Sequence, residues 1–282
     1  MTTSGARGAR RARSYDPGKV RTALAAQTEA VRAVVHRLCA DPAAGLLLER
    51  PTRLGGWRVR ELVAHLAVQL AWVPEHLDDP AQGRGVLDLT GWASGVGSLS
   101  ELLDAGARAS GAADFAGEPA AVAAGFDRAA DALLALLAGP EVLDEKRRFE
   151  IRLGSMTLAD MLVTRLVEAV VHADDLADAL ELPAFAHDRF ALASVCRLLA
   201  DVFADQQPGG AVELRIPPFA VVQAVPGPRH TRGTPPNVVE TDPLGWIRLA
   251  TGRLGWEAAV ERAELTASGE RSDLSAFLPV LH

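Results

Sequence analysis

Four segments with the apolar spacing of an amphipathic helix constrain this fold more than any other feature of the sequence. They cover about residues 17–41, 58–77, 119–137 and 157–182. Apolar residues recur in each of them at intervals of three and four, so one face of each helix must be covered by another element. Amphipathic helices at this density predict an all-α four-helix bundle in the N-terminal part of the chain.

The first and last of these segments begin with capping chemistry. Asp16 precedes Pro17, which is the order expected for an N-cap residue and a proline at the first helical position. Thr157 is followed three residues later by Asp160, an arrangement similar to a capping box. We therefore expect helices that start at about Pro17 and just after Thr157.

A different pattern begins after Pro183. One more helix is expected at about residues 187–204, and short β-forming runs then alternate with short helical patterns. The expected strands are 211–216, 219–225, 237–240 and 265–268, and the expected helices are 243–251, 256–262 and 273–278. Strands and helices interleaved in one short stretch predict a small α+β domain.

The sequence thus predicts three parts. A basic, disordered tail covers residues 1–15, a helical bundle covers 16–182 and an α+β domain covers 183–282. Within the bundle, residues 78–118 are rich in Gly, Ala, Ser and Asp, so we expect a long connection with one short helix near 99–108. The arginines of the tail leave open a contact arm for a regulatory partner.

Charge and hydropathy argue against two kinds of partner. The formal net charge is −7 and the pI is about 5.5, which does not suit binding to a phosphate backbone, so no nucleic-acid partner is expected. No stretch approaches the roughly 20 apolar residues of a membrane span. No apolar h-region follows the basic residues of the tail, so we do not expect the tail to be a secretory signal. Cys39 and Cys196 have no C-x-x-C partner and fit the reduced core thiols of a cytoplasmic protein. We expect a monomer or a homodimer.

Ionisable residues form a line along the helix expected at 157–182. At 100° per residue, one line holds Met161, Arg165, Glu168, His172 and Asp175. It separates an apolar face, formed by Leu162, Leu166, Ala169, Ala173, Leu176 and Leu180, from a solvent-facing side, formed by Asp160, Thr164, Asp174, Asp178 and Glu181. Ionisable groups at the edge of an interface between helices can be partly buried and still be accessible to a ligand in a cleft.

Glu168 and His172 are one helical turn apart, with Cβ atoms roughly 6 Å from each other, so both can bind one metal ion. A third ligand must come from another helix, and His65 provides one in the segment 58–77. His76 cannot share a metal ion with His65, because eleven residues span roughly 16 Å along a helix. Two histidines and one glutamate leave a coordination position open, as in catalytic zinc sites.

Residues beside these three are candidates for cofactor contacts. Asp175 can accept a hydrogen bond from a ligand imidazole. Arg165 and Trp72 lie on the same two helical lines, and we expect them to contact a cofactor together with Asp175. A simpler interpretation stays open. An E-x-x-x-H pair on a helix is usually a surface pair, and Arg165 with Glu168 can form an intrahelical ion pair worth a few tenths of a kcal/mol.

Two motifs resemble those of a known family. Residues 56–66, GWRVRELVAHL, resemble the G-W-x-V-x-[DE]-L-x-x-H-L signature of the DinB-like superfamily, and in particular of the mycothiol-dependent maleylpyruvate isomerase family. Residues 165–176, RLVEAVVHADDL, resemble the second signature of that family, R-x-x-E-x-x-x-H-x-x-D-L. Arg58 departs from the pattern, because members often have Thr or Ser there as the N-cap.

This resemblance implies a DinB-like four-helix bundle that binds a divalent metal ion, zinc in the first place, through His65, Glu168 and His172. It further implies that mycothiol, a low-molecular-weight thiol, binds the metal and attacks a small electrophile as the thiolate. In an isomerase the thiolate adds to an activated double bond, allows rotation and leaves. In an S-transferase it stays attached to the product.

The C-terminal part resembles the bacterial sterol-carrier-like domain over residues 212–218, 241–253 and 267–274. The resemblance implies an α+β domain of the SCP2-like kind, with a sheet and an apolar cavity or groove. A second functional hypothesis follows from it, in which the chain carries a lipid or another hydrophobic ligand and the helical bundle is a scaffold.

Three arginines in this C-terminal part are candidates for a catalytic role, because a guanidinium can hold a substrate carboxylate through two parallel hydrogen bonds. They are Arg229, Arg248 and Arg253. Ordinary pairing at the surface or between the two domains is the alternative interpretation for each of them.

Overall fold

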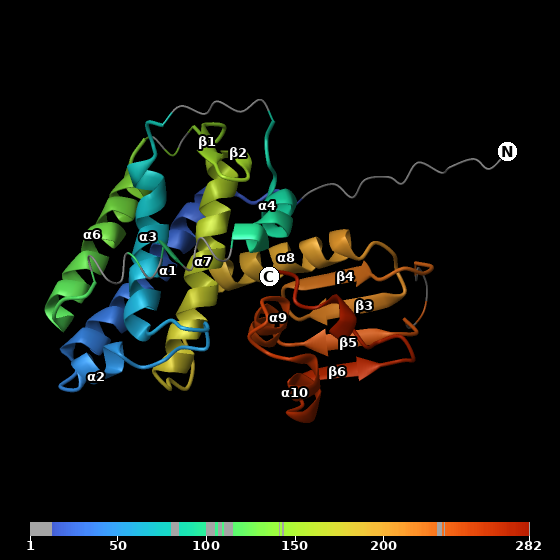
Figure 1. Cartoon of the computed structure of the whole chain (residues 1–282). Helices are drawn as coiled ribbons and strands as arrows, with labels where there is room; N and C mark the ends of the chain where they lie inside the picture. The colour runs from blue at the N-terminus through green and yellow to red at the C-terminus, as the bar shows by residue number, and fades with distance from the viewer. Residues whose placement is uncertain are drawn as a thin grey trace.

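The computed structural model describes residues 13–79, 85–99, 105–106, 109, 115–140, 142, 144–229, 233 and 235–281. A helical N-terminal region precedes an α+β C-terminal region, as the sequence predicts (Figure 1). The helical region contains α1 (Pro17–Ala40), α2 (Ala44–Leu48), α3 (Val59–Glu75), α4 (Leu89–Gly95), η1 (Val96–Leu99), α6 (Pro119–Ala138), β1 (Arg148–Ile151), β2 (Gly154–Thr157) and α7 (Leu158–Ala179). The C-terminal region contains α8 (Arg189–Gln206), β3 (Val212–Ile216), β4 (Ala220–Ala224), β5 (Val238–Thr241), α9 (Pro243–Ala250), α10 (Trp256–Glu261), β6 (Leu265–Ser268) and η3 (Ser275–Phe277). Most of the predicted tail and of the helix predicted near 99–108 lies outside the described residues.

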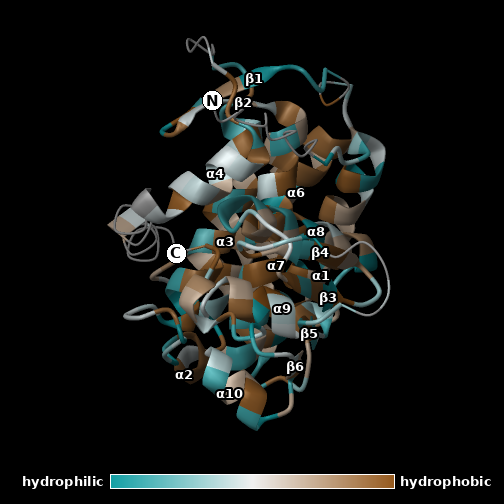
Figure 2. Ribbon diagram, turned by 90° about the vertical axis from the view of Figure 1, so that its right-hand side faces the viewer, coloured by the Kyte–Doolittle hydropathy of each residue, from teal (hydrophilic) through white to brown (hydrophobic). Residues whose placement is uncertain are grey.

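The long helices of the N-terminal region surround a common core. α1 packs against α6 and α7, and α3 packs against the same two helices. Fully buried side chains from these helices fill the space between them: Leu24, Leu62, Leu66, Phe126, Leu133 and Leu158. Figure 2 shows hydrophobic ribbon segments gathered in the middle of the molecule around α7. This packing fixes the position of α7 relative to α3, which the site requires.

Local chemistry explains where these helices begin. The Asp16 side chain accepts a hydrogen bond from the Lys19 amide at the start of α1, and Thr157 caps α7 through the Asp160 amide, as predicted. Arg58 provides no small polar cap to α3. Glu61 compensates, because its side chain accepts a hydrogen bond from the Arg58 amide at 2.8 Å.

Several elements of the helical region are absent from the sequence prediction, among them α2, a hairpin and α4. β1 and β2 form an antiparallel hairpin in which Arg148 pairs with Thr157, directly before α7. α4 lies within the segment 78–118, which the sequence predicts as a connection with a helix only near its middle. The strands of the hairpin have four residues each, and α4 has seven, which is too short for a periodic pattern to be recognised.

The C-terminal region is a four-stranded sheet with helices packed against it. The strand order is β4-β3-β5-β6, with β3 and β5 parallel and the other pairs antiparallel. α8 packs against β4 and α9. Between them the rings of Phe203 and Trp246 meet edge to face at 5.8 Å, and both are fully buried. Two large aromatic side chains therefore form part of the core between α8 and α9.

The solvent-facing side predicted for α7 is wrong at two positions. Thr164 and Asp174 are buried, with exposed fractions of 0% and 2%. The prediction gave α7 one covered face, but α4 and α8 pack against it in addition to α1 and α3. Arg248 from α9 also reaches Asp174. Helical periodicity alone does not include this second layer.

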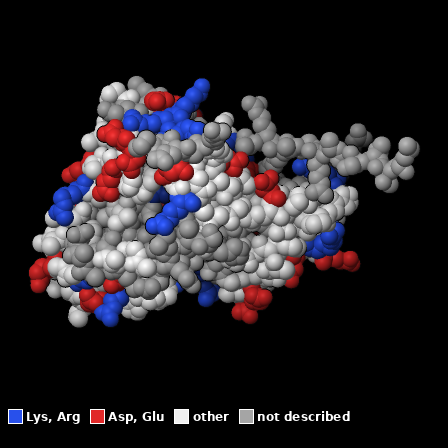
Figure 3. All heavy atoms as spheres, turned by 45° about the horizontal axis from the view of Figure 1, so that its top comes forward, with Lys and Arg blue, Asp and Glu red and all other residues white. Residues whose placement is uncertain are grey.

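None of the helices in the described residues combines the length and the apolar character needed to span a membrane. On the face drawn in Figure 3, acidic and basic side chains are interspersed, without an extended patch of one sign among the residues described.

Candidate metal centre

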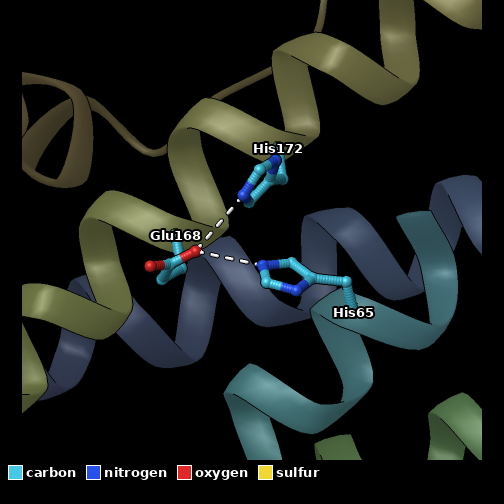
Figure 4. A group of neighbouring side chains, drawn as sticks. All are labelled: His65, Glu168 and His172. Carbon is cyan, nitrogen blue, oxygen red and sulfur yellow. Dashed lines mark hydrogen bonds and ion pairs between the residues drawn. The ribbon is translucent and has the colours of Figure 1, made fainter. Parts of the chain in front are cut away.

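Side chains from α3 and α7 converge at one point of the helical region. His65 comes from α3, and Glu168 and His172 come from successive turns of α7 (Figure 4). One ligand atom of each residue lies within 4.8 Å of the others. The three side chains are nearly buried, with exposed fractions of 6%, 14% and 12%. The structure therefore brings together the residues that the sequence predicts as metal ligands.

Both imidazoles face the same oxygen of Glu168. Oε2 lies 3.3 Å from His65 Nε2 and 3.2 Å from His172 Nε2. The second ring nitrogen of His172, Nδ1, donates a hydrogen bond to Asp175 Oδ2 at 2.9 Å. In a neutral imidazole this arrangement places the lone pair of His172 on Nε2, directly opposite a carboxylate oxygen. Two such atoms repel unless a proton or a metal ion lies between them, so the donor set fits a cation.

The electrostatics of the three groups agree with this geometry. Burial alone would raise the pKa of Glu168, but hydrogen bonds from His172 and His65 outweigh it and hold the pKa well below its usual value. Burial disfavours the charged form of His172, yet Asp175 and Glu168 raise its pKa. Burial lowers the pKa of His65 despite its contact with Glu168. One imidazole therefore takes up a proton readily while the other stays neutral.

Trp57 closes one side of the cluster. Its ring centroid lies 4.9 Å from that of His65 and 6.2 Å from that of His172, and the residue is 6% exposed. The sequence marks Trp57 only as part of a motif. Its place directly before α3 is the signal that could have identified it, because a large ring at the start of the helix that carries His65 lies near that histidine.

The next turn of α7 carries two buried carboxylates that meet arginines from distant segments. Asp174 accepts hydrogen bonds from Arg248 Nε at 2.9 Å and Nη2 at 2.7 Å, and from Arg53 Nη2 at 2.5 Å. Asp175 accepts from Arg53 Nε at 2.7 Å and from Arg253 Nη2 at 3.0 Å. The arginines outweigh the effect of burial and keep the pKa of Asp174 below its usual value. Sequence analysis missed Arg53, which no motif or spacing singles out.

Two hollows border the cluster. The larger one, of about 430 Å³, is lined by Glu168, Arg165, Met161, Gln69, Trp72 and Trp92, with the β1–β2 hairpin at its edge. The smaller one, of about 110 Å³, is bordered by Glu168, His172, Trp92 and Arg253. Glu168 belongs to both, so a ligand in either hollow can reach the point where the three side chains meet.

The other predicted site residues occupy different positions. Trp72 and Arg165 line the larger hollow, and Asp175 holds His172. Arg253 borders the smaller hollow but is bonded to Asp175, and Arg248 is bonded to Asp174. Arg229 follows β4 and lies against Gly210. Within the described residues no contact joins it to the cluster, so the structure does not bring Arg229 to the site.

Fold and site together define a two-part protein, in which a helical region with a His₂Glu cluster is joined to a small α+β region. The family model described as the mycothiol maleylpyruvate isomerase N-terminal domain matches residues 24–177, more than half of the chain. The chain belongs to this family. A second model, described as a bacterial SCP ortholog, matches residues 188–280.

Solved structures resemble the chain over almost its whole length. The crystal structure of the mycothiol-dependent maleylpyruvate isomerase has a TM-score of 0.57 and 16% sequence identity, over 92% of this chain and 95% of that chain. A histidine-to-alanine variant of the mycothiol-dependent maleylpyruvate isomerase has a TM-score of 0.56 and 17% identity, with the same coverage. At this identity the likeness concerns the fold. A comparison with curated proteins gave no match.

Proposed function

We propose that the protein is a metal-dependent enzyme that uses a low-molecular-weight thiol, mycothiol in the first place, in an isomerase or S-transferase reaction on a small electrophile. The observation that carries the proposal is the convergence of His65, Glu168 and His172 beside a hollow of about 430 Å³. Membership of a family named for a mycothiol-dependent isomerase supports the choice of thiol and reaction.

In this proposal His65, Glu168 and His172 hold a divalent ion, zinc in the first place, within a DinB-like helical bundle. Such an ion, when bound, favours the thiolate form of a thiol at its open position, and the thiolate is the stronger nucleophile at neutral pH. Two histidines and one glutamate leave that position free. The same ligand set also suits other divalent ions of the first transition series.

The surrounding residues of the chain each have a physical task. Asp175 fixes the tautomer of His172 by accepting its Nδ1 proton. Trp57 covers the imidazoles and keeps water from that side. Arg253 acts on the cluster through Asp175, which already accepts its hydrogen bonds. Trp72 forms a wall of the larger hollow and is placed to contact the thiol or the electrophile.

The reaction of the isomerase type needs no net change in the thiol. The thiolate sulfur bonds to one carbon of an activated double bond, whose π electrons move onto the electron-withdrawing group. The remaining single bond rotates, and the carbon–sulfur bond then breaks to restore the double bond and the thiolate. A nearly buried site suits this sequence, because it limits protonation of the intermediate by bulk water.

The hypothesis of a lipid carrier rests on the match to the bacterial SCP ortholog. It requires an apolar cavity in the C-terminal region. Phe203 and Trp246, together with buried Ile247 and Leu214, occupy the space between the sheet and its helices. This packing favours a structural role for the C-terminal region over ligand carriage.

Metal analysis tests the proposal first. Chelator-free wild-type protein is compared with His65→Ala and His172→Ala, and with His36→Ala as a matched control. His36 is a half-exposed histidine of α1 that contacts Asp127. We expect about one equivalent of a divalent metal in the wild type and in the control, and loss of it in the two ligand variants. A wild type without metal after reconstitution, or unchanged metal in His172→Ala, contradicts the proposal.

The thiol is tested with the metal-loaded enzyme. We expect isomerisation of maleylpyruvate, or consumption of the thiol with a related electrophile, only when mycothiol is added. Turnover that is equally fast without any thiol contradicts the thiol-dependent part of the proposal while leaving the metal site intact.

A further inference from the structure

Arg165 is a buried cation without a paired carboxylate among the residues that the structure describes. It lies on α7 one turn before Glu168 and is 7% exposed. Its hydrogen-bond acceptors are neutral: Thr164 Oγ1 accepts from Nε at 3.2 Å and from Nη2 at 3.1 Å, and the side-chain and main-chain oxygens of Gln69 accept from Nη1. In the part of the chain that the structure describes, no carboxylate lies within 4.0 Å of this guanidinium.

The arginines on the other side of the cluster differ from it. Arg248 is bonded to Asp174, Arg253 to Asp175, and Arg53 to both carboxylates. Burying a guanidinium without a paired anion costs several kcal/mol, so an unpaired one persists only where function retains it. Burial lowers the pKa of Arg165 even though Glu168 lies near enough to oppose that effect. Arg165 is therefore the arginine of this site whose charge is left for a ligand.

The surroundings of Arg165 are those of a ligand site. It lines the larger hollow together with Glu168, which lies about 4.5 Å further along the helix axis. Trp72 and Trp92 line the same hollow, and the Trp72 ring stacks on His76 with centroids 4.4 Å apart. A divalent ion on one carboxylate and two neutral imidazoles, beside this guanidinium, would leave the site with an excess of positive charge. An anionic ligand removes that excess.

We propose that Arg165, rather than Arg248 or Arg253, binds a carboxylate of the small-molecule ligand in the larger hollow. This inference rests on the proposed function for its reactive partner, the thiolate held at the triad. Small carboxylic acids that carry an electrophilic group suit a hollow lined by this guanidinium and by Trp72 and Trp92. Arg165 is the specificity-determining residue of the site.

Isothermal titration of the full chain with maleate tests this assignment, and maleamide serves as the uncharged probe of the same shape. Arg165→Met is compared with Arg262→Met, which removes the same charge from an exposed position on the C-cap of α10. We expect maleate to bind about 30-fold more weakly to Arg165→Met, as for a lost charge-assisted contact. Maleamide affinity should be unchanged, and Arg262→Met should bind both probes as the wild type does. Equal affinity of wild type and Arg165→Met for maleate overturns the assignment.

A stability measurement separates ligand binding from a merely structural role. If Arg165 is held for a ligand, Arg165→Met removes an unpaired buried charge, so the urea midpoint of the ligand-free protein should rise. If its hydrogen bonds to Gln69 and Thr164 are what matter, the midpoint falls and the wild type discriminates little between maleate and maleamide. That pair of results overturns the proposal. Should Arg165→Met fail to fold, Arg165→Lys takes its place, with an expected loss of about 10-fold for maleate.

Two further arms identify the source of the carboxylate. Thioglycolate and 2-mercaptoethanol are titrated as charged and neutral thiols. If the affinity for maleate depends on Arg165, the carboxylate belongs to the electrophile. If only the affinity for thioglycolate depends on Arg165, the carboxylate belongs to the thiol. Dependence for neither overturns the proposal.

The same titrations are run on metal-free and zinc-loaded protein. Loss of the Arg165 effect at full metal content refutes this inference and leaves the proposed function standing. If the protein takes up no metal but maleate binding still depends on Arg165, the proposed function is contradicted and the assignment of Arg165 stands.

Discussion

Two buried polar clusters lie one turn apart on α7 and are neutralised in different ways. The acidic pair Asp174 and Asp175 meets arginines of this chain, drawn from the segment before α3 and from the C-terminal region. The triad at Glu168 and His172 has a single carboxylate oxygen shared by two imidazoles, with an unneutralised arginine beside it. The first cluster is complete within the chain, whereas the second, in the proposed function, receives a metal ion and a ligand.

This difference separates stability from function along one helix. Partners supplied by the chain tie its segments together in every state of the protein, so the acidic pair fixes the C-terminal region against α7. In the proposed function the partners of the triad come from outside the chain, so the triad gains its full set of contacts only when the metal ion is bound. Variants of each cluster should therefore affect different measurements.

The largest effect on folding is expected for Asp174→Ala. The change leaves Arg53 and Arg248 without their shared buried carboxylate, which should cost about 3 kcal/mol of unfolding free energy. Urea denaturation measures it. A change below about 1 kcal/mol would mean that these arginines find other partners, and the contrast between the two clusters would lose its basis.

A smaller effect, on metal binding, is expected for Asp175→Asn, the variant at the junction of the two clusters. The amide oxygen can still accept from His172 Nδ1, but it does so without a full negative charge. Loss of such a supporting partner should weaken metal binding about 10- to 100-fold. A competition assay with a chromophoric chelator measures the metal affinity. An unchanged affinity would show that the acidic pair does not influence the triad.

Acid should weaken the cluster that the arginines complete. Burial opposes it, but Arg248 and Arg53 hold the pKa of Asp174 below its unfolded value of about 3.9. The resulting stability is complete above the unfolded pKa and is lost as the pH falls through the lower folded value. Each unit of difference contributes about 1.4 kcal/mol. Unfolding free energies measured from pH 6 to pH 2.5 should fall less steeply for Asp174→Asn than for the wild type, and parallel curves would contradict this.

The smallest effect is expected for Asp178→Ala, one turn beyond the acidic pair. Asp178 is 50% exposed, and its oxygen lies 3.7 Å from Arg53. Exposed pairs of this kind contribute about 0–1 kcal/mol. The variant is thus a control for Asp174→Ala in the same urea experiment, since both remove a carboxylate from the reach of Arg53. A loss as large as that of Asp174→Ala would assign the effect to overall charge rather than to burial.

Local patterns predicted most elements of the fold. Apolar periodicity and capping residues predicted the starts of α1 and α7 within one residue, because these signals depend only on neighbours along the chain. The strands β3 to β6 were found for the same reason. The hairpin before α7 was missed, because its four-residue strands carry no recognisable alternation and are formed by pairing with each other.

The candidate site was predictable to a different extent. Helical geometry placed Glu168 and His172 side by side, and the motif resemblance selected His65 as the third residue. Pairing between distant segments was not predictable. Nothing in the sequence indicates that Arg53 reaches Asp174, or that Thr164 is buried. Such contacts depend on how whole elements pack.

The contacts of Asp175 limit which C-terminal domains can be joined to this helical region. Asp175 accepts a hydrogen bond from His172 of the helical region and another from Arg253 of the C-terminal region. The C-terminal region is therefore not an interchangeable module. A chimera that joins this helical region to another C-terminal domain must supply an arginine at the same place. Without it, Asp175 loses one of its two partners and the orientation of the His172 imidazole changes. Substitutions at the two ends of this contact should accordingly be inherited together.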